Sequence, residues 1–399
     1  MNILADAHIP YLRGVAEQFG HVEYLPGNEF SKETIKEKDA LIVRTVTRFD
    51  EKILAGSKVK LICSATIGFD HIDTAYCDAN GIAWRTAPGC NANSVEQYVT
   101  TSLLFLAEKF HFKLNEKTIG IVGVGNVGTK VAAACEKLGM RVLLNDPPRE
   151  EAERLLGEGE KRRLGERETG REGDDARGGE GGWEKTDFVD LETIKREADI
   201  ITFHTPLTKT GKHKTYHLAD EIFFNSLQKK PFIINSSRGS VVDNMALKSA
   251  LKADKVSGAA IDCWENEPDI NPELLEIVDI ATPHIAGYSA DGKWMATKMS
   301  VENLKVFFQS SITPEFSPLP PPLHPIINLQ DIEPEKQLAH AIWHTYNPMK
   351  ETVELKSAPE KFYWFRSNYP LRREYKAYTV VKAAPDVGDI LQKLGFNLQ

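Results

Sequence analysis

The stretch Lys117-Thr-Ile-Gly-Ile-Val-Gly-Val-Gly-Asn-Val-Gly128 joins a short apolar run to a glycine-rich turn. The apolar run is rich in β-branched residues and predicts a buried strand. The turn has the spacing G-x-G-x-x-G, and apolar residues recur at helical spacing after it. A second apolar run, Met140–Leu144, predicts another strand, which Asp146 follows. The stretch therefore predicts a strand, a tight turn, a helix and a second strand in close succession.

This arrangement is typical of a dinucleotide-binding unit, because each part of it has a physical role. Gly123 permits a tight turn, Gly125 lets the backbone approach a pyrophosphate, and Gly128 lets the helix pack closely on the strand. The pyrophosphate would bind the unpaired N–H groups at the start of the helix. Asp146 can accept hydrogen bonds from an adenosine ribose and would repel a 2′-phosphate, which favours NAD over NADP. A lone G-x-G-x-x-G is often only a turn, but the complete pattern of strand, turn, helix, second strand and acid outweighs that reading. Arg149 lies close enough to leave binding of a 2′-phosphate open.

The composition is that of a soluble globular protein with more than one domain. The 399 residues are too many for a single hydrophobic core. The net charge of −8 is spread along the chain, which argues against a nucleic-acid partner. Five scattered cysteines without a C-x-x-C indicate reduced thiols and no metal site. With no signal-like start and no apolar run near about eighteen residues, we expect a cytoplasmic protein with no membrane partner.

The chain divides into parts with different patterns. Residues 1–92 alternate short strands and helices, which predicts a flavodoxin-like parallel sheet, with a helix over Tyr11–Phe19. Part of 290–310 is expected to complete this first, substrate-binding domain. Residues 93–292 form the predicted Rossmann-type NAD-binding domain. Within it, 150–183 is dominated by Glu, Arg, Lys and Gly and predicts a disordered insertion, because it offers little apolar surface to bury.

The C-terminal part begins after a proline-rich segment. Residues 311–325 contain six prolines and predict an extended linker. Residues 326–399 then predict an α+β domain with one helix over Glu360–Tyr369. This small domain carries Trp343 and an aromatic run at 362–365, which is more apolar surface than it can bury alone. We therefore expect a dimerisation domain that holds a homodimer together.

Polar side chains follow the predicted strands of the first domain. Arg44 and Thr45 follow one strand, and Thr66 follows the next. Ligands bind at the carboxyl ends of the strands in open parallel sheets, so these residues are candidates for contacts with substrate. Arg44 could equally be a solvated surface arginine, and His71 and Asp73 are more simply explained as caps of the helix that they begin.

Three side chains after consecutive strands of the second domain form a set with a shared chemistry: Arg238, Glu267 and His284. Arginine binds a carboxylate with two parallel hydrogen bonds. Histidine can take a proton from a hydroxyl near neutral pH, and a carboxylate beside the imidazole orients it and favours its protonated form. Each residue alone has a plain structural explanation, but together they indicate oxidation of a 2-hydroxy acid.

Around these residues the sequence resembles the D-isomer specific 2-hydroxyacid dehydrogenase family. The motifs are Asn235-Ser-Ser-Arg-Gly239, Asp262-Cys-Trp-Glu-Asn-Glu-Pro268 and Pro283-His-Ile-Ala-Gly287. In that family the counterparts of Arg238, Glu267 and His284 anchor the carboxylate, pair with the base and transfer the proton, respectively. The resemblance also implies NAD contacts at Asn126, Val127, Asp146, Thr205, Ser236, Ser237, Asp262 and Gly287, and substrate contacts at Thr45, Thr66 and Tyr288.

A closer resemblance is to the family members that oxidise a phosphorylated four-carbon hydroxy acid. Its carriers include Pro88-Gly-Cys-Asn-Ala92, Phe365-Arg-x-Asn-Tyr369 and Arg372-Arg373. This resemblance implies a homodimer that oxidises 4-phospho-D-erythronate to (3R)-3-hydroxy-2-oxo-4-phosphooxybutanoate, with NAD taking the hydride, in pyridoxal 5′-phosphate biosynthesis. Two alternatives stay open. One is another D-2-hydroxyacid dehydrogenase, such as one that acts on 3-phosphoglycerate, and the other is a non-catalytic NAD-sensing protein that binds a partner protein.

The phosphate of such a substrate needs a cation or several donors at some distance from C2. Arg44 and Thr45 end a strand of the first domain, so we expect them to bind the phosphate end. Arg366 and Arg373, contributed by a partner subunit, are further candidates for this role.

Overall fold

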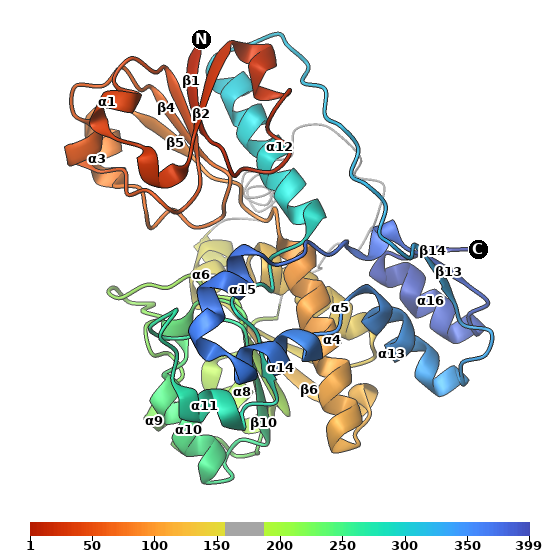
Figure 1. The fold of residues 1–399 in the computed structure, drawn as a ribbon. Coiled ribbons are helices and arrows are strands. Elements are labelled where there is room, and N and C mark those ends of the chain that lie inside the picture. The colour runs from red at the N-terminus through yellow and green to blue at the C-terminus, as the bar shows by residue number, and fades with distance from the viewer. Residues whose placement is uncertain (156–186) are drawn as a thin grey trace. The chain divides into compact units, whose positions relative to one another are not determined.

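The computed structural model describes residues 1–155 and 187–399, which form two compact units (Figure 1). The segments are 1–91 and 289–320 in unit 1, and 92–288 and 321–399 in unit 2. The insertion predicted at 150–183 lies outside the described residues from position 156 onward. The residues before that position belong to helix α6 (Pro147–Leu155). None of the helices in the described ranges is long and apolar enough to cross a membrane.

Unit 1 is a five-stranded parallel sheet with the strand order β2-β1-β3-β4-β5. Its strands are β1 (Asn2–Asp6), β2 (His21–Leu25), β3 (Ala40–Val43), β4 (Leu61–Ser64) and β5 (Ala83–Arg85). Its α-helices are α1 (Lys32–Ile35), α2 (Glu51–Leu54), α3 (Thr74–Ala79) and the long α12 (Ala290–Phe307). The strand order is the flavodoxin-like one, which confirms the fold predicted for this part of the chain.

Both faces of this sheet are buried, which explains why its strands are continuous apolar runs. Along β1, Ile3 and Leu4 are on opposite faces and join different apolar clusters. Val301 and Leu304 of α12 pack in the cluster of Ile3, so the second segment of unit 1 completes its core.

The helix predicted over Tyr11–Phe19 is wrong over most of its length. Only Ala16–Phe19 is helical, as a short 3-10 turn. Tyr11 has a φ of 62° and Gly14 a φ of 85°, and a right-handed helix cannot contain these left-handed conformations. The apolar spacing of the segment therefore serves the packing of a turn and not of a helix face.

Unit 2 contains a six-stranded parallel sheet with the order β11-β10-β9-β8-β6-β7. Its strands are β6 (Thr118–Val122), β7 (Arg141–Asn145), β8 (Ile200–Phe203), β9 (Phe232–Asn235), β10 (Gly258–Ile261) and β11 (Ile280–Ala281). Besides α6, the helices around it are α4 (Ala92–Phe110), α5 (Asn126–Lys137), α8 (Leu191–Glu197), α9 (Glu221–Asn225), α10 (Asn244–Lys252) and α11 (Pro272–Ile277). β7 pairs with one edge of β6 and β8 pairs with the other, so the strand order reverses at β6. This reversal confirms the Rossmann-type prediction. The carboxyl ends of β6 and β8 form its topological switch point.

Residues 321–399 belong to the same compact unit as this sheet. They form α13 (Pro334–Thr345), α14 (Met349–Ser357), α15 (Phe362–Ser367), α16 (Pro385–Leu394) and the strands β12 (Ile326–Asn328), β13 (Thr379–Val381) and β14 (Asn397–Leu398). The three strands pair in the order β12-β13-β14. The segment thus has the α+β character predicted for it, but its helix at Glu360–Tyr369 is shorter than predicted. A 3-10 turn precedes α15, and Asn368 already has a non-helical conformation.

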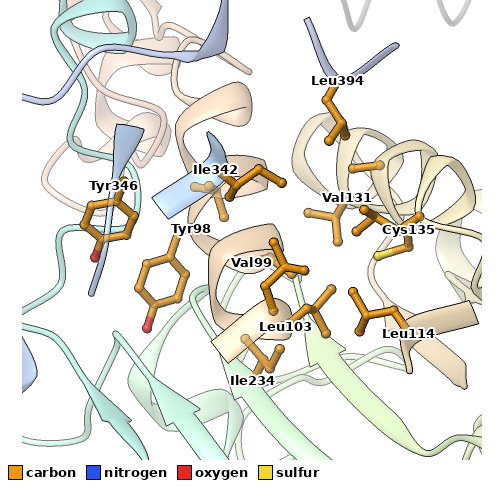
Figure 2. Packing of buried hydrophobic residues seen from close by; sticks show 14 of the residues in the cluster. Tyr98, Val99, Leu103, Leu114, Val131, Cys135, Ile234, Ile342, Tyr346 and Leu394 are labelled. Atoms are coloured by element: carbon orange, nitrogen blue, oxygen red, sulfur yellow. The ribbon is translucent and has the colours of Figure 1, made fainter. Parts of the chain in front are cut away.

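The C-terminal segment shares its hydrophobic core with the NAD-domain helices (Figure 2). Tyr98 and Val99 of α4 and Val131 of α5 lie in one cluster with Ile342 of α13 and Leu394 of α16. Helix α4 contacts α13, α5 contacts α16, and α14 contacts β11. Of these elements, β11 is the strand that His284, one of the predicted catalytic residues, follows.

Candidate active site

The glycine-rich turn after β6 has three glycines in three different environments. Gly123 has a φ of 93°, and a Cβ there would lie 2.7 Å from the backbone carbonyl carbon of His204. A Cβ on Gly128 would lie 1.9 Å from the carbonyl oxygen of Gly123, so the turn and α5 can approach only without a side chain. A Cβ on Gly125 would meet nothing within 4 Å. The turn is therefore closed on two sides and open at Gly125, where a ligand can reach the backbone.

Several polar groups near this turn are left for a ligand to satisfy. Helix α5 begins at Asn126 and Val127, and its N-cap, Gly125, offers no side chain to the first N–H groups. The hydroxyls of Thr205 and Ser236, which follow β8 and β9, are buried with no hydrogen-bond partner in the described part of the chain. Buried hydroxyls without partners are costly in a folded protein. A helix start with open N–H groups and two orphan hydroxyls fit a dinucleotide with a pyrophosphate.

Asp146 is held by the turn that it faces. Its Oδ2 accepts a hydrogen bond from the Val124 N–H (2.8 Å), and its Oδ1 accepts one from the Arg149 N–H (3.1 Å). The Arg149 guanidinium bonds with Glu153 (2.9 Å) and with the Val124 carbonyl. Arg149 is thus already engaged, which weakens the case for a 2′-phosphate at this position.

A histidine and a glutamate form a close pair beyond β10 and β11. His284 Nδ1 lies 2.8 Å from Glu267 Oε2 and 3.1 Å from Oε1, and Oε1 also accepts the Trp264 N–H (2.9 Å). Burial of Glu267 acts to raise its pKa. The hydrogen bond and charge of His284, the Trp264 N–H and the Arg366 guanidinium together outweigh burial and lower the pKa below its ordinary value. Glu267 is therefore an ionised partner that holds Nδ1 and leaves Nε2 for chemistry.

The loop after β9 presents Arg238. Asn235 ends the strand, and its side chain accepts from the Ser237 hydroxyl (2.9 Å) and donates to the Arg238 carbonyl (3.1 Å). A Cβ on Gly239 would lie 1.8 Å from the Trp264 carbonyl oxygen, so this loop packs against the chain that leads to Glu267. Arg238 thus follows β9 and the Glu267–His284 pair follows β10 and β11, which are neighbours in the sheet.

Asp262, a predicted NAD contact, is buried and held by several hydrogen bonds within the protein. Its side chain is only 1% exposed, and burial raises its pKa. Its carboxylate accepts from the Thr282 hydroxyl (2.6 Å) and from the N–H groups of Ile285 (2.7 Å) and Ala286 (3.0 Å). These bonds hold the loop that contains Gly287, and the contact of Asp262 with NAD stays a prediction.

The predicted substrate residues of unit 1 are Arg44, Thr45 and Thr66. Arg44 Nε donates to Oδ2 of the buried Asp6 (2.9 Å), and its Nη2 lies 3.3 Å from Oδ1. Asp6 is the last residue of β1 and Arg44 follows β3, and the ends of these two strands form the topological switch point of this sheet. Thr45 is exposed, and the Thr66 hydroxyl bonds with that of Ser64 (2.6 Å). Arg44 is therefore oriented by Asp6, although its side chain is still 32% exposed.

His71 is not itself the helix cap. It is buried, and burial lowers its pKa. Asp73 caps α3 through a bond from the Tyr76 N–H.

Arg366 was expected to come from a partner subunit, and the structure places it beside Glu267 of its own chain. Its Nη1 lies 3.9 Å from Glu267 Oε2, and its guanidinium lies 5.9 Å from the centre of the Tyr288 ring. Arg372, from the same segment, bonds with the loop that follows His284. Both arginines lie in the motifs Phe365-Arg-x-Asn-Tyr369 and Arg372-Arg373, but the motifs do not show which residues the arginines contact. Only the packing of the C-terminal segment does.

Two family models match the chain. The D-isomer specific 2-hydroxyacid dehydrogenase NAD binding domain matches residues 92–166 and 179–286, and a domain of unknown function matches residues 319–395. An erythronate-4-phosphate dehydrogenase from Bacteroides thetaiotaomicron is 49% identical over 96% of this chain and 99% of its own length. The chain belongs to the erythronate-4-phosphate dehydrogenase family. The family model and this membership confirm the predicted NAD-dependent 2-hydroxyacid dehydrogenase.

A more distant relative matches over the full length of the chain, and a solved structure shares part of its fold. The erythronate-4-phosphate dehydrogenase of Proteus mirabilis is 39% identical over 100% of this chain and 99% of its own. The NAD-bound 3-phosphoglycerate dehydrogenase of Entamoeba histolytica superposes with a TM-score of 0.60 at 22% identity, over 78% of this chain and 96% of its own. That likeness supports the fold alone.

Proposed function

We propose that this chain oxidises 4-phospho-D-erythronate at C2 to (3R)-3-hydroxy-2-oxo-4-phosphooxybutanoate, as the names of its full-length relatives indicate for them. The observation that carries the proposal is the Glu267–His284 pair, because it supplies a base at the strand ends of an NAD-binding sheet. The pathway served would be pyridoxal 5′-phosphate biosynthesis.

The residues of unit 2 divide the chemistry among themselves. NAD, when bound on the turn at Gly123–Gly128, supplies the acceptor for the hydride that leaves C2. His284 Nε2 takes the proton of the C2 hydroxyl, while Glu267 holds Nδ1–H and stabilises the imidazolium. Arg238 binds the substrate carboxylate through two parallel hydrogen bonds. Tyr288, four residues after His284, is a substrate contact by family resemblance.

The phosphate end requires separate cations. Arg44 is the proposed contact, with Thr45 and Thr66 as neighbouring donors. Its ion pair with Asp6 fixes the direction of the guanidinium, and its Nη1 makes no hydrogen bond within residues 1–155 and 187–399. Charge-assisted hydrogen bonds of this kind contribute roughly 1.5–3 kcal/mol each.

A turnover assay tests the proposal. The full chain is incubated with NAD and 4-phospho-D-erythronate while NADH absorbance is followed, with unphosphorylated erythronate and 3-phosphoglycerate as comparison substrates. We expect the highest kcat/KM for the phosphorylated four-carbon acid. Preference for 3-phosphoglycerate would reassign the substrate, and NAD binding without turnover of any of the three would favour an NAD-sensing protein.

We also propose that the chain is a cytoplasmic homodimer joined through its C-terminal segment. Tyr363 and Trp364 on α15 are 65% and 58% exposed, as a buried interface would require of the isolated chain. In sedimentation experiments Trp364→Glu should shift the chain towards monomer. Ile222→Glu, at a more exposed apolar position on α9 of the same unit, is the control and should stay dimeric. Dimers of unchanged stability in the Trp364 variant would place the interface elsewhere.

A further inference from the structure

The loop His284–Tyr288 holds the proposed base in a strained conformation. His284 itself has a φ of 57°, in the left-handed region that residues with a Cβ rarely adopt. Such a conformation persists only where surrounding contacts enforce it. On one side the loop is fixed through its N–H groups: His284 donates to the Asp262 carbonyl (2.9 Å), and the next two N–H groups donate to the Asp262 carboxylate.

The opposite side of the loop is fixed through its carbonyl groups by Arg372. Its Nη2 donates to the Ala286 carbonyl (2.5 Å), and its Nη1 lies 3.2 Å from the Ile285 carbonyl and 3.4 Å from that of Tyr288. Asp262 and Arg372 therefore hold the two edges of the same short loop. One comes from the NAD-binding sheet, and the other comes from the C-terminal segment of the same unit.

Arg372 is itself fixed by its surroundings. It is 8% exposed, and its Nε donates to the Gln97 side chain (2.9 Å) while Nη2 also reaches the Ser94 carbonyl (3.0 Å). Its guanidinium lies 4.2 Å from the centre of the Tyr346 ring, and Nη1 lies 3.2 Å from the Tyr369 hydroxyl. Gln97 and Ser94 belong to α4, so the arginine ties the loop to the longest helix of the unit.

The charge of Arg372 has no carboxylate partner within hydrogen-bond distance among the residues that the structure describes. Its hydrogen bonds go to carbonyl oxygens, an amide and a phenol. Burying a guanidinium on neutral acceptors is unfavourable, and apolar residues of similar volume often replace buried charges without loss of stability. An arginine kept here is better explained by the geometry of its planar fork of five donors than by its contribution to folding.

We propose that Arg372 is a positioning residue for catalysis, which fixes the loop of His284 and so makes the C-terminal segment part of the active site of its own chain. The inference rests on the proposed dehydrogenase function. A reacting group displaced by about 1 Å can lose roughly 10²-fold in rate, so a loosened loop should lower kcat much more than it lowers cofactor affinity. Lysine keeps the positive charge, but its three donors are all on one nitrogen. It therefore cannot bond with Ser94, Gln97 and the loop at the same time.

The test compares Arg372→Lys with Leu391→Ala in the full chain. Leu391 of α16 is fully buried in the core cluster that the C-terminal segment shares with α4 and α5. Its apolar side chain forms no hydrogen bond with the loop, so Leu391→Ala should destabilise the segment without loosening the loop. We expect Arg372→Lys to lose about 10²-fold in kcat while the Kd for NADH changes less than about threefold. We expect Leu391→Ala to lower Tm at least as much and to keep kcat within about threefold of the wild type.

Amide hydrogen exchange gives a readout that does not need turnover. The Ile285 and Ala286 amides, which donate to Asp262, should exchange faster in Arg372→Lys and at the wild-type rate in Leu391→Ala. If the lysine variant does not fold, Gln97→Met removes one anchor of the guanidinium and should raise the same exchange rates and lower kcat by several-fold. The proposal would be overturned if folded Arg372→Lys kept the wild-type exchange rates and kcat. It would also be overturned if Arg372→Lys and Leu391→Ala lost kcat equally. A wild-type chain without turnover would instead refute the proposed function, and the exchange measurement would still decide whether Arg372 holds the loop.

Discussion

Two histidines follow strands of the same sheet and have opposite properties. His204 follows β8, its Nε2 bonds with the Thr202 hydroxyl (3.0 Å), its Nδ1 is buried without a partner among the described residues, and burial lowers its pKa to about 3. His284 follows β11, and a carboxylate holds its Nδ1. A position at a strand end is therefore not enough for a histidine to act as a base. It also needs an ionised partner on one ring nitrogen and a second nitrogen that can take the proton.

The largest effect should come from removing the paired histidine. His284→Ala is expected to lower kcat by about 10²–10⁴-fold, the usual contribution of a general base, while NADH still binds because the cofactor turn is untouched. Stopped-flow turnover and fluorescence titration with NADH measure the two properties. A kcat within about tenfold of the wild type would mean that another group accepts the proton.

Removing only the charge of the partner should have a smaller effect and a diagnostic pH dependence. In Glu267→Gln the imidazolium loses its ionised neighbour, so the acidic limb of the kcat/KM profile should move to lower pH. The loss of rate should be less than the roughly 10²-fold expected at minimum for losing the base itself. A profile that coincides with that of the wild type would remove Glu267 from its assigned role.

The same variant should change how stability depends on pH. The folded-state pKa of Glu267 is lowered from 4.5, so the pair stabilises the fold fully above that pH and loses this contribution as the pH falls through the lowered pKa. Glu267→Gln should therefore have a flatter Tm–pH curve below about pH 4.5. Parallel curves for the two proteins would show that the pairing energy is negligible.

Asp146, which follows β7, extends the comparison to a strand end where the adenosine ribose of NAD is predicted to bind. Asp146→Ala should reduce the preference for NAD over NADP on the order of tenfold, because the lost bonds to a ribose are charge-assisted. The measurement is the ratio of kcat/KM for the two cofactors. An unchanged ratio would mean that another residue reads the ribose.

The smallest effect is expected at His204. Because its pKa is about 3, it stays neutral throughout the working range, and His204→Asn should leave the shape of the pH–rate profile between about pH 5 and pH 9 unchanged. A shifted limb would show that His204 titrates during catalysis and would erase the contrast with His284.

The sequence by itself determined the parts that depend on local pattern. The glycine spacing and the apolar runs around Gly123 predicted the Rossmann-type unit, because a tight turn and a buried parallel strand each impose residue types at short range. The same reasoning failed at Tyr11–Phe19, where apolar spacing suits a helix but two left-handed residues prevent one.

Only the tertiary structure decided which groups meet. Arg366 lies near Glu267 of its own chain, the Asp262 carboxylate holds the loop after His284, and Arg372 bonds with Ser94 of α4, 278 positions earlier in the chain. No periodicity links residues so far apart, because these contacts arise from the packing of the C-terminal segment on α4 and α5. The residues after the strands thus indicate the chemistry of the site. The contacts of Arg372 with the loop of His284 come from the C-terminal segment, for which the sequence predicted only dimerisation.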